Sequence, residues 1–215
     1  MKKRLAALIT ALVLCLLAPL CASAEVKARS IEKNGKITET VWEDEHGNPV
    51  PQGEVGELAV YGPGVMLCYY KNPEATDEVL KGEWLWTGDM ARMDEDGFIY
   101  LVDRKKDVVI SGGENLYPVQ IEDFLRGFDK IKDVAVIGLP DARLGEIAAA
   151  IVELKEGVTC TQEEIDEFCM GMPRYKRPKQ IIFDKIPRNP TGKIEKPALR
   201  EKYCKGRLVE SQITG

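Results

Sequence analysis

The chain has 215 residues, 44% of them apolar and 30% charged, an ordinary balance for a soluble globular protein of one or two small domains. Its 30 basic and 35 acidic residues give a formal net charge of −5. The basic stretch 174–177 is too short to follow a phosphate backbone, so the charge pattern argues against DNA or RNA binding.

The first 24 residues have the three parts of a secretory signal. Three basic side chains open the chain, an apolar run covers residues 5–20, and residues 22–24 read Ala-Ser-Ala. The apolar run is short for a membrane-spanning helix. We therefore expect cleavage after Ala24 and export of a mature protein that keeps no membrane anchor.

Four cysteines remain beyond this leader, and their spacing fits neither a metal cluster nor a small disulfide framework. They are Cys68, Cys160, Cys169 and Cys204. We expect free thiols, a usage typical of a reducing compartment. The leader and the body of the chain therefore indicate different compartments.

Residues 25–103 read mostly as β-structure. The segment 25–55 is polar and turn-rich, and its sequence His46-Gly47-Asn48 predicts a hairpin tip. The stretch "GELAVYG" (56–62) has the pattern of a strand, and Asn72-Pro73 predicts the start of a short helix. The segment 83–103 predicts two strands joined by a turn at residues 94–97.

The pattern changes after Asp103, where strands begin to alternate with helices. The stretch "DVVISGGE" predicts a strand and a glycine turn, "PVQIEDFLR" a helix, and "VAVIGL", "AAAIVEL" and "QIIFD" three strands. Thr161 and Glu164 have the spacing of a capping box for a further helix. The sequence therefore predicts an α+β or α/β fold, with a compact domain over 107–205 that is large enough to bury a core.

Five motifs follow one another in regular order over residues 53–203: "GELAVYGPGVMLCYYKNPEAT", "WLWTGD", "DGFIYLVDRKKDVVISGGENLYPVQIE", "YKRPK" and "PRNPTGKIEK". Together they resemble the adenylate-forming superfamily, and within it the AMP-forming acyl-CoA ligases. The resemblance implies the β-rich end of the large N-terminal domain over 25–103 and a hinge at 104–107. It also implies the small, mobile C-terminal domain over 107–205, followed by a tail over 206–215.

The resemblance implies a reaction as well. Family members use ATP, with Mg²⁺, to convert a carboxylic acid to an acyl-adenylate and pyrophosphate, and then pass the acyl group to the thiol of coenzyme A. The large domain binds ATP and the acid, and the small domain rotates between the two half-reactions. ATP, CoA and a carboxylic acid are thus the implied ligands, and the implied Mg²⁺ ligands lie in the large domain.

Two residues match family positions at the nucleotide. Asp89, which ends Thr87-Gly88-Asp89, matches an aspartate that holds the ribose hydroxyls of ATP, because a carboxylate can accept from both hydroxyls. Arg104 matches an arginine near the same ribose and phosphates, whose oxygens suit its planar fork. Outside the resemblance the first is a common turn and the second a solvated charge.

Two further segments match the family's hinge and its binding path for CoA. Lys106 matches the hinge, where a hydrated side chain tolerates changing surroundings. Ser111, Gly112 and Gly113 match the turn that lines the pantetheine path, where glycines permit close approach of the backbone. Without the resemblance, the two glycines predict only a turn.

Lys193 matches the catalytic lysine, which is expected to contact the acid's carboxylate and the α-phosphate during adenylation. A preorganised cation at such a site is typically worth about 10²–10³ in rate. Pro187, Pro190 and Gly192 are expected to shape its loop. The sequence around Lys193 also suggests a phosphate-binding P-loop as an alternative. That motif requires Gly at position 187 and Ser or Thr at position 194, where this chain has Pro187 and Ile194.

Most of the family's large domain, including its phosphate loop and acyl pocket, has no counterpart in this sequence. We therefore expect no catalysis by this chain alone. Residues 25–103 are then expected to present open sheet edges and to be less stable than residues 107–204.

Three hypotheses remain open from the sequence. The chain is the C-terminal part of an acyl-CoA ligase completed by a separately encoded partner, or an exported, non-catalytic protein that joins a signal peptide to a ligase fragment. In the third, the start is misplaced or the sequence joins unrelated pieces. The stretch "SGGENLYP" slightly favours fatty, aromatic or carnitine-type acids over acetate as the substrate.

Overall fold

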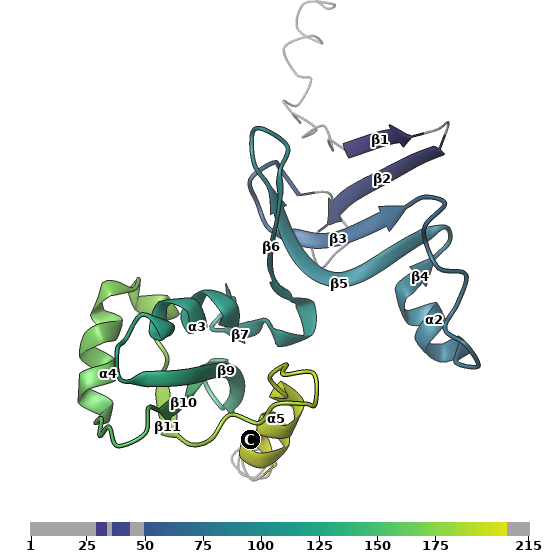
Figure 1. Cartoon of the computed structure of the whole chain (residues 1–215). Coiled ribbons are helices and arrows are strands. Elements are labelled where there is room, and N and C mark those ends of the chain that lie inside the picture. Colours follow the sequence, from purple (N-terminus) through teal and green to yellow (C-terminus); the bar gives the residue numbers. More distant parts are fainter. Residues whose placement is uncertain (1–28, 34–35, 44–49, 206–215) are drawn as a thin grey trace, which may run out of the picture.

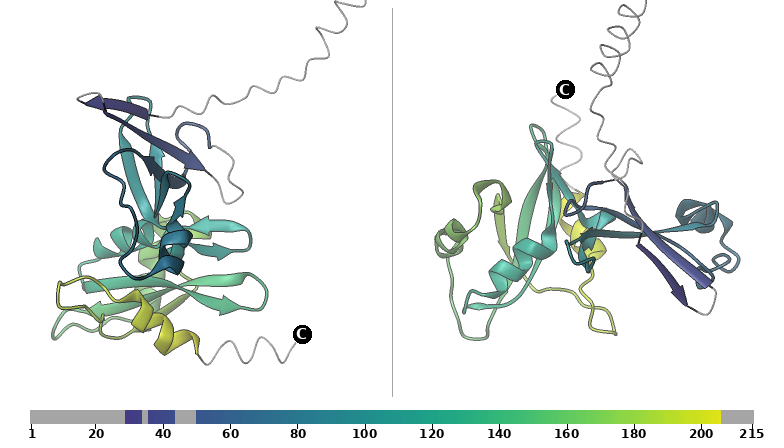
Figure 2. Two further views of the ribbon diagram at one scale, coloured as in Figure 1. Left: turned by 90° about the vertical axis from the view of Figure 1, so that its right-hand side faces the viewer. Right: turned by 90° about the horizontal axis from the view of Figure 1, so that it is seen from above.

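The computed structural model describes residues 29–33, 36–43 and 50–205, so the leader, the expected hairpin tip at 46–48 and the tail lie outside the described residues. Two units, each built on a β-sheet, follow one another along the chain (Figure 1). The N-terminal unit ends at Arg104, and a short 3₁₀ turn, η1 (Lys105–Asp107), leads into the C-terminal unit. Two perpendicular views show the sheets as separate bodies that meet near this turn (Figure 2).

The N-terminal unit is an antiparallel sheet in the order β1-β2-β3-β5-β4, with β6 also paired to β5. Its elements are β1 (Arg29–Lys33), β2 (Lys36–Glu43), β3 (Gly56–Tyr61), α2 (Pro73–Val79), β4 (Leu80–Lys81), β5 (Trp84–Met93) and β6 (Ile99–Arg104). The predicted helix start is confirmed, since the Asn72 side chain accepts a hydrogen bond from the N–H of Ala75 (3.1 Å). The predicted turn is confirmed too, with the N–H of Gly97 donating to the carbonyl of Asp94 (3.1 Å).

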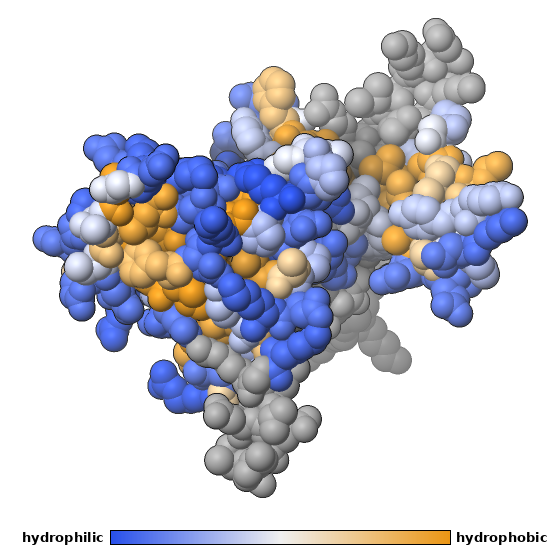
Figure 3. Space-filling model, turned by 60° about the horizontal axis from the view of Figure 1, so that its bottom comes forward, coloured by the Kyte–Doolittle hydropathy of each residue, from blue (hydrophilic) through white to orange (hydrophobic). Residues whose placement is uncertain are grey.

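Among residues 50–104, where burial is described, few apolar side chains of the N-terminal unit are buried. Its cluster of buried hydrophobic residues consists of Ala91 and Met93, with Val50, Leu58 and Ile99 packed against them. Helix α2 buries none of its residues. Figure 3 shows apolar surface on this unit at the right of the view.

The C-terminal unit is a five-stranded sheet covered by helices. Its elements are β7 (Val109–Ser111), β8 (Glu114–Leu116), α3 (Pro118–Arg126), β9 (Ile131–Asp141), β10 (Gly145–Leu154), α4 (Gln162–Phe168), the 3₁₀ turns η2 (Cys169–Gly171) and η3 (Arg174–Lys176), β11 (Gln180–Phe183) and α5 (Lys196–Cys204). Strand β10 is central and pairs antiparallel with β9 and β7 and parallel with β11. The fold is thus mixed α+β, with mostly antiparallel pairing.

Both faces of the β9–β10 pair are buried, and for this reason the two strands read as continuous apolar runs. Val134 and Val136 face one cluster, which includes Ile121 and Leu125 of α3 and Ile165 of α4. The alternate residues of β9 face a second cluster with α5, formed around Ala135, Ile137, Leu139 and Leu199. Because successive strand residues point to opposite faces, one strand serves two cores.

The predicted helix boundaries of this unit are confirmed where capping chemistry marks them. Helix α3 begins at Pro118, and the capping box of Thr161 and Glu164 is formed at the start of α4. Helix α5 was not predicted, although Pro197 in its first turn is a standard start signal. The strand pair β1–β2 lies in the polar, turn-rich segment 25–55, within the region that the sequence predicts to be mostly β-structure.

Candidate functional site

An open cleft of about 680 Å³ lies where β6, α3 and the loop before α5 come together. Charged side chains dominate its lining. The lining residues are Asp89, Leu101, Val102, Asp103, Arg104, Asp107, Val119, Glu122, Arg126, Arg188, Lys193, Ile194 and Lys196. The structure thus brings three of the predicted site residues, Asp89, Arg104 and Lys193, to one cleft from segments as far apart as residues 89 and 193.

Asp89 and Arg104 are direct cross-strand neighbours, at the last residue pair between β5 and β6. The Nε of Arg104 lies 2.9 Å from Oδ1 of Asp89, and the aspartate side chain is 29% exposed. Gly88 has φ +71°, a conformation that glycine adopts without strain. The hydroxyl of Thr87 holds the backbone before Asp89 in place. It donates to the carbonyl of Leu58 (2.8 Å) and accepts from the N–H of Asp89 (3.1 Å).

The loop that carries Lys193 is organised by one carboxamide. Oδ1 of Asn189 accepts from the N–H of Thr191 (3.1 Å), the N–H of Lys193 (2.9 Å) and the hydroxyl of Thr191 (2.8 Å). The N–H of Asn189 donates to the carbonyl of Lys193 (2.9 Å), and Gly192 turns the chain with φ +84°. The Lys193 backbone is therefore held while its side chain is exposed.

Ion pairs fasten this loop at both ends. Before Lys193, the Nε of Arg188 donates to Oδ2 of Asp133 (3.0 Å), and another of its nitrogens donates to the Gly192 carbonyl. After Lys193, the Nζ of Lys196 lies 2.7 Å from Oε1 of Glu122. Both of these last side chains are nearly buried, at 12% and 5% exposure. Lys193 is thus three residues from a buried ion pair.

Buried acidic groups lie at the floor of the cleft. Besides Lys196, Glu122 accepts from the N–H of Val136 (2.9 Å) and pairs with Arg126. Asp103 is 8% exposed. Burial raises the pKa of Asp103, against the lowering effect of its backbone hydrogen bonds and of Lys196, and the nearby Glu122 charge adds to the rise.

The predicted pantetheine turn is not part of this cleft. Gly112 and Gly113 form the turn between β7 and β8 with φ +60° and +87°. The N–H of Gly112 donates to the carbonyl of Leu144 (2.8 Å), and a Cβ on Gly112 would come within 3.2 Å of the Leu144 side chain. Neither glycine nor Ser111 is among the residues that line the cleft of Lys193.

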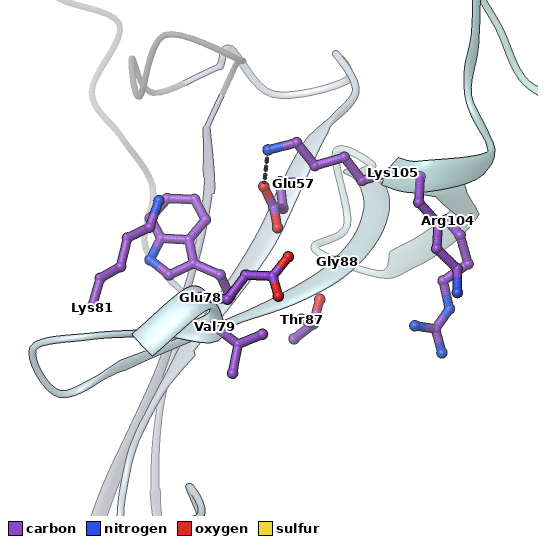
Figure 4. A pocket seen from close by; sticks show the side chains of 10 residues that line it. Glu57, Glu78, Val79, Lys81, Thr87, Gly88, Arg104 and Lys105 are labelled. Atoms are coloured by element: carbon purple, nitrogen blue, oxygen red, sulfur yellow. Dashed lines mark hydrogen bonds and ion pairs between the residues drawn. The ribbon is translucent and has the colours of Figure 1, made fainter. Parts of the chain in front are cut away.

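The predicted hinge residue, Lys106, lies in η1 and lines a smaller cleft of about 370 Å³ on the N-terminal unit. In this cleft the Nζ of Lys105 reaches Oε2 of Glu57 (2.6 Å), the contact drawn as a dashed line in Figure 4. Within residues 50–205, Lys106 makes no hydrogen bond or ion pair of its own. Its side chain is therefore unrestrained by such contacts in this structure.

Sequence reasoning missed Glu122, Lys196 and Arg188. Glu122 carries a usable signal, because it stands on the buried face of α3 with Pro118, Ile121 and Leu125. An acidic residue within an apolar stripe must be paired when the helix packs. Its partner could not be found from the sequence, since Lys196 is 74 positions away.

No helix among residues 50–205 is long and apolar enough to cross a membrane. No group of three His, Cys, Asp or Glu side chains in the described part of the chain could hold a metal ion.

Comparisons with known proteins identify relatives for the same region. Residues 120–193 match the AMP-binding enzyme C-terminal domain. The chain is 42% identical over 179 residues to a long-chain-fatty-acid–CoA ligase of Mycobacterium tuberculosis, covering 82% of this chain and 35% of that enzyme. It is 43% identical over 159 residues to a feruloyl-CoA synthase of Amycolatopsis, covering 73% of this chain and 32% of that enzyme.

A solved structure agrees with these sequence matches. ATP-bound MatB from Rhodopseudomonas palustris superposes with a TM-score of 0.71 at 35% identity, covering 79% of this chain and 34% of MatB. The chain thus spans about a third of the length of the curated relatives that it matches.

Proposed function

Because the chain belongs to the adenylate-forming superfamily, as a counterpart of the C-terminal portion of its acyl-CoA ligases, we propose that it contributes Lys193 to an ATP-dependent, AMP-forming acyl-CoA ligase. That portion works together with an N-terminal portion, which accounts for the other two thirds of the relatives' length. The observation that carries the proposal is the shared cleft of Lys193, Asp89 and Arg104.

Each of the three residues has a role that suits its chemistry. Asp89 accepts hydrogen bonds from the ribose hydroxyls of ATP, and Arg104 orients that carboxylate through the 2.9 Å ion pair and lies near the phosphates. Lys193 places a cation where negative charge grows as a carboxylate oxygen attacks the α-phosphorus and pyrophosphate leaves. The thiol of CoA then attacks the acyl carbon, and AMP leaves.

The N-terminal portion is required because positioning supplies much of the rate in such reactions. ATP and the acid bind to the N-terminal portion, and so does the Mg²⁺ that generally accompanies ATP in this family.

The acid is proposed to be a fatty or aromatic carboxylic acid. The relatives described above are named as a long-chain-fatty-acid–CoA ligase and a feruloyl-CoA synthase. Ser111, Gly112 and Gly113 are proposed to line the path of the CoA arm after the C-terminal unit has rotated, with Lys106 as the hinge. In the present arrangement the cleft holds Lys193 instead.

Mixing tests the proposal. The chain is combined with the N-terminal portion of a related ligase, and acid-dependent release of pyrophosphate is measured. We expect activity from the mixture, no activity from either part, and a loss of about 10²–10³ with Lys193→Ala. Lys155→Ala, an exposed lysine in another turn, is the matched control and should retain activity. Equal activity of the Lys193→Ala and Lys155→Ala mixtures contradicts the proposed role.

The sequence of residues 1–24 favours a second candidate, an exported protein without catalytic function. Its basic start, apolar run and Ala-Ser-Ala segment are those of a secretory signal. The intact mass and the compartment of the native protein separate the two candidates. An extracellular protein lacking residues 1–24 supports the second, and a cytosolic protein supports the ligase partner.

A further inference from the structure

Each charged residue in the segment between the two units that forms an ion pair does so with only one of the units. Three ion pairs involve the segment 104–107: Arg104 with Asp89, Lys105 with Glu57, and Asp107 with Arg200. The first two tie the junction to strands of the N-terminal unit, and the third ties it to α5. None of these three pairs joins residues 50–103 to residues 108–205.

Asp103 differs, because its carboxylate spans the junction. Oδ1 accepts from the N–H of Arg104 (2.8 Å), and Oδ2 accepts from the N–H of Val119 in the first turn of α3 (2.8 Å). Asp103 lies on β6 of the N-terminal unit, whereas α3 belongs to the C-terminal unit. The hydrogen bond between Asp103 and the N–H of Val119 therefore joins residues 50–103 to residues 108–205.

Helix α3 lacks a side-chain cap of its own. Tyr117 occupies the N-cap position and makes no capping hydrogen bond, and Pro118 has no N–H. The N–H of Val119, in the first turn, has no acceptor within the helix and donates to Asp103 instead. A carboxylate at this position satisfies the donor and lies favourably at the positive end of the helix dipole.

We propose that Asp103 is a positioning residue that caps α3 across the junction. It thereby holds the C-terminal unit in the orientation that places Lys193 in the cleft with Asp89 and Arg104. The proposal rests on these contacts and stands whether or not the chain takes part in a ligase. A side chain that stabilises only one unit would make its hydrogen bonds within that unit, whereas Asp103 bonds to α3 of the other unit.

The orientation of the units can be measured by residual dipolar couplings of backbone amides in the native protein. In the wild type, couplings from β3 and β5 and couplings from β9 and β10 should fit one alignment tensor. With Asp103→Ala, each unit should need its own tensor, and the amide of Val119 should exchange on the order of ten times faster. Unchanged chemical shifts in β9 and β10 show that the variant is folded.

Asp141→Ala is the matched control. Asp141 also accepts from two backbone amides, those of Arg143 (3.0 Å) and Leu144 (2.8 Å), but all three lie in the C-terminal unit. This variant should keep one tensor. Asp103→Asn should restore it in part, because the single amide oxygen can still accept from the N–H of Val119 although the NH₂ group cannot accept from the N–H of Arg104.

Three results would overturn the proposal. One is a single tensor with unchanged orientation in Asp103→Ala, and another is an Asp103→Asn protein that behaves like the alanine variant. The third needs no substitution, and so it holds even if Asp103→Ala does not fold. It is rapid exchange of the Val119 amide in the wild type, where the cross-junction cap is expected to protect it.

Discussion

The two units contain sheets of similar size but bury their strands differently. In the C-terminal unit, helices cover both faces of β9 and β10, and two clusters of buried residues result. In the N-terminal unit, the buried cluster consists of Ala91 and Met93 with three partly buried neighbours, while Leu67 and Tyr70 are 94% and 84% exposed. A sheet gains stability from the surfaces that cover it more than from its number of strands.

Hydrogen exchange gives the largest expected contrast between the units. Amides of β9 and β10 should exchange on the order of a thousand times more slowly than amides of β3 and β5, equivalent to ~4 kcal/mol, because buried strands open only when the unit unfolds. Exchange of native protein followed by NMR measures both sets at once. Similar protection in the two sheets would remove the predicted difference in stability.

Two lysine substitutions compare a buried ion pair of the C-terminal unit with a more exposed ion pair of the N-terminal unit. Lys196→Ala removes the nearly buried partner of Glu122 and leaves only the more exposed Arg126, and should destabilise the C-terminal unit by about 3 kcal/mol. Lys105→Ala removes a lysine that is 54% exposed, so water can replace it beside Glu57, and the loss should be about 1 kcal/mol. Urea unfolding of both variants provides the measurement. Equal losses would show that burial does not set the difference between these pairs.

Acid gives the smallest effect, at the contact between α5 and the end of β11. Hydrogen bonds from Lys202, then from the Tyr203 hydroxyl and the Lys185 N–H, lower the pKa of Asp184 from 3.8 to about 2. Because the pKa is depressed in the folded state, this stabilisation is present above pH 3.8 and is lost as the pH falls through 2.

Asp184→Asn should therefore flatten the acid limb of the stability curve of the C-terminal unit. The effect should be about 1 kcal/mol or less, because water reaches the partly exposed carboxylate. Thermal unfolding between pH 2 and pH 5 measures it, with the pH-independent part of the curve as the internal reference. Parallel curves for the two proteins would mean that this contact adds no pH-dependent stability.

Local chemistry made much of the fold predictable. The capping box of Thr161 and Glu164 gave the start of α4, and the uninterrupted apolar runs of β9 and β10 indicated strands, which the structure shows to be buried on both faces. The order of the motifs likewise identified Asp89, Arg104 and Lys193 as candidate site residues, and the fold places them in one cleft.

Pairings over long distances in the sequence could not be predicted. The ion pair of Glu122 with Lys196 and the cap from Asp103 to Val119 depend on how whole elements pack. No periodicity or local propensity encodes such a pairing. The parallel placement of β11 beside β10 is also a tertiary outcome, since both strands read alike.

The carboxamide of Asn189 has a consequence for the entropy of binding. Its three accepted hydrogen bonds lie within residues 189–193, so the loop takes its shape from its own atoms rather than from a ligand. Backbone freedom around Lys193 is lost when the chain folds and need not be lost again when a substrate arrives. In the proposed rotation of the C-terminal unit, the lysine backbone would travel with it already in its final conformation.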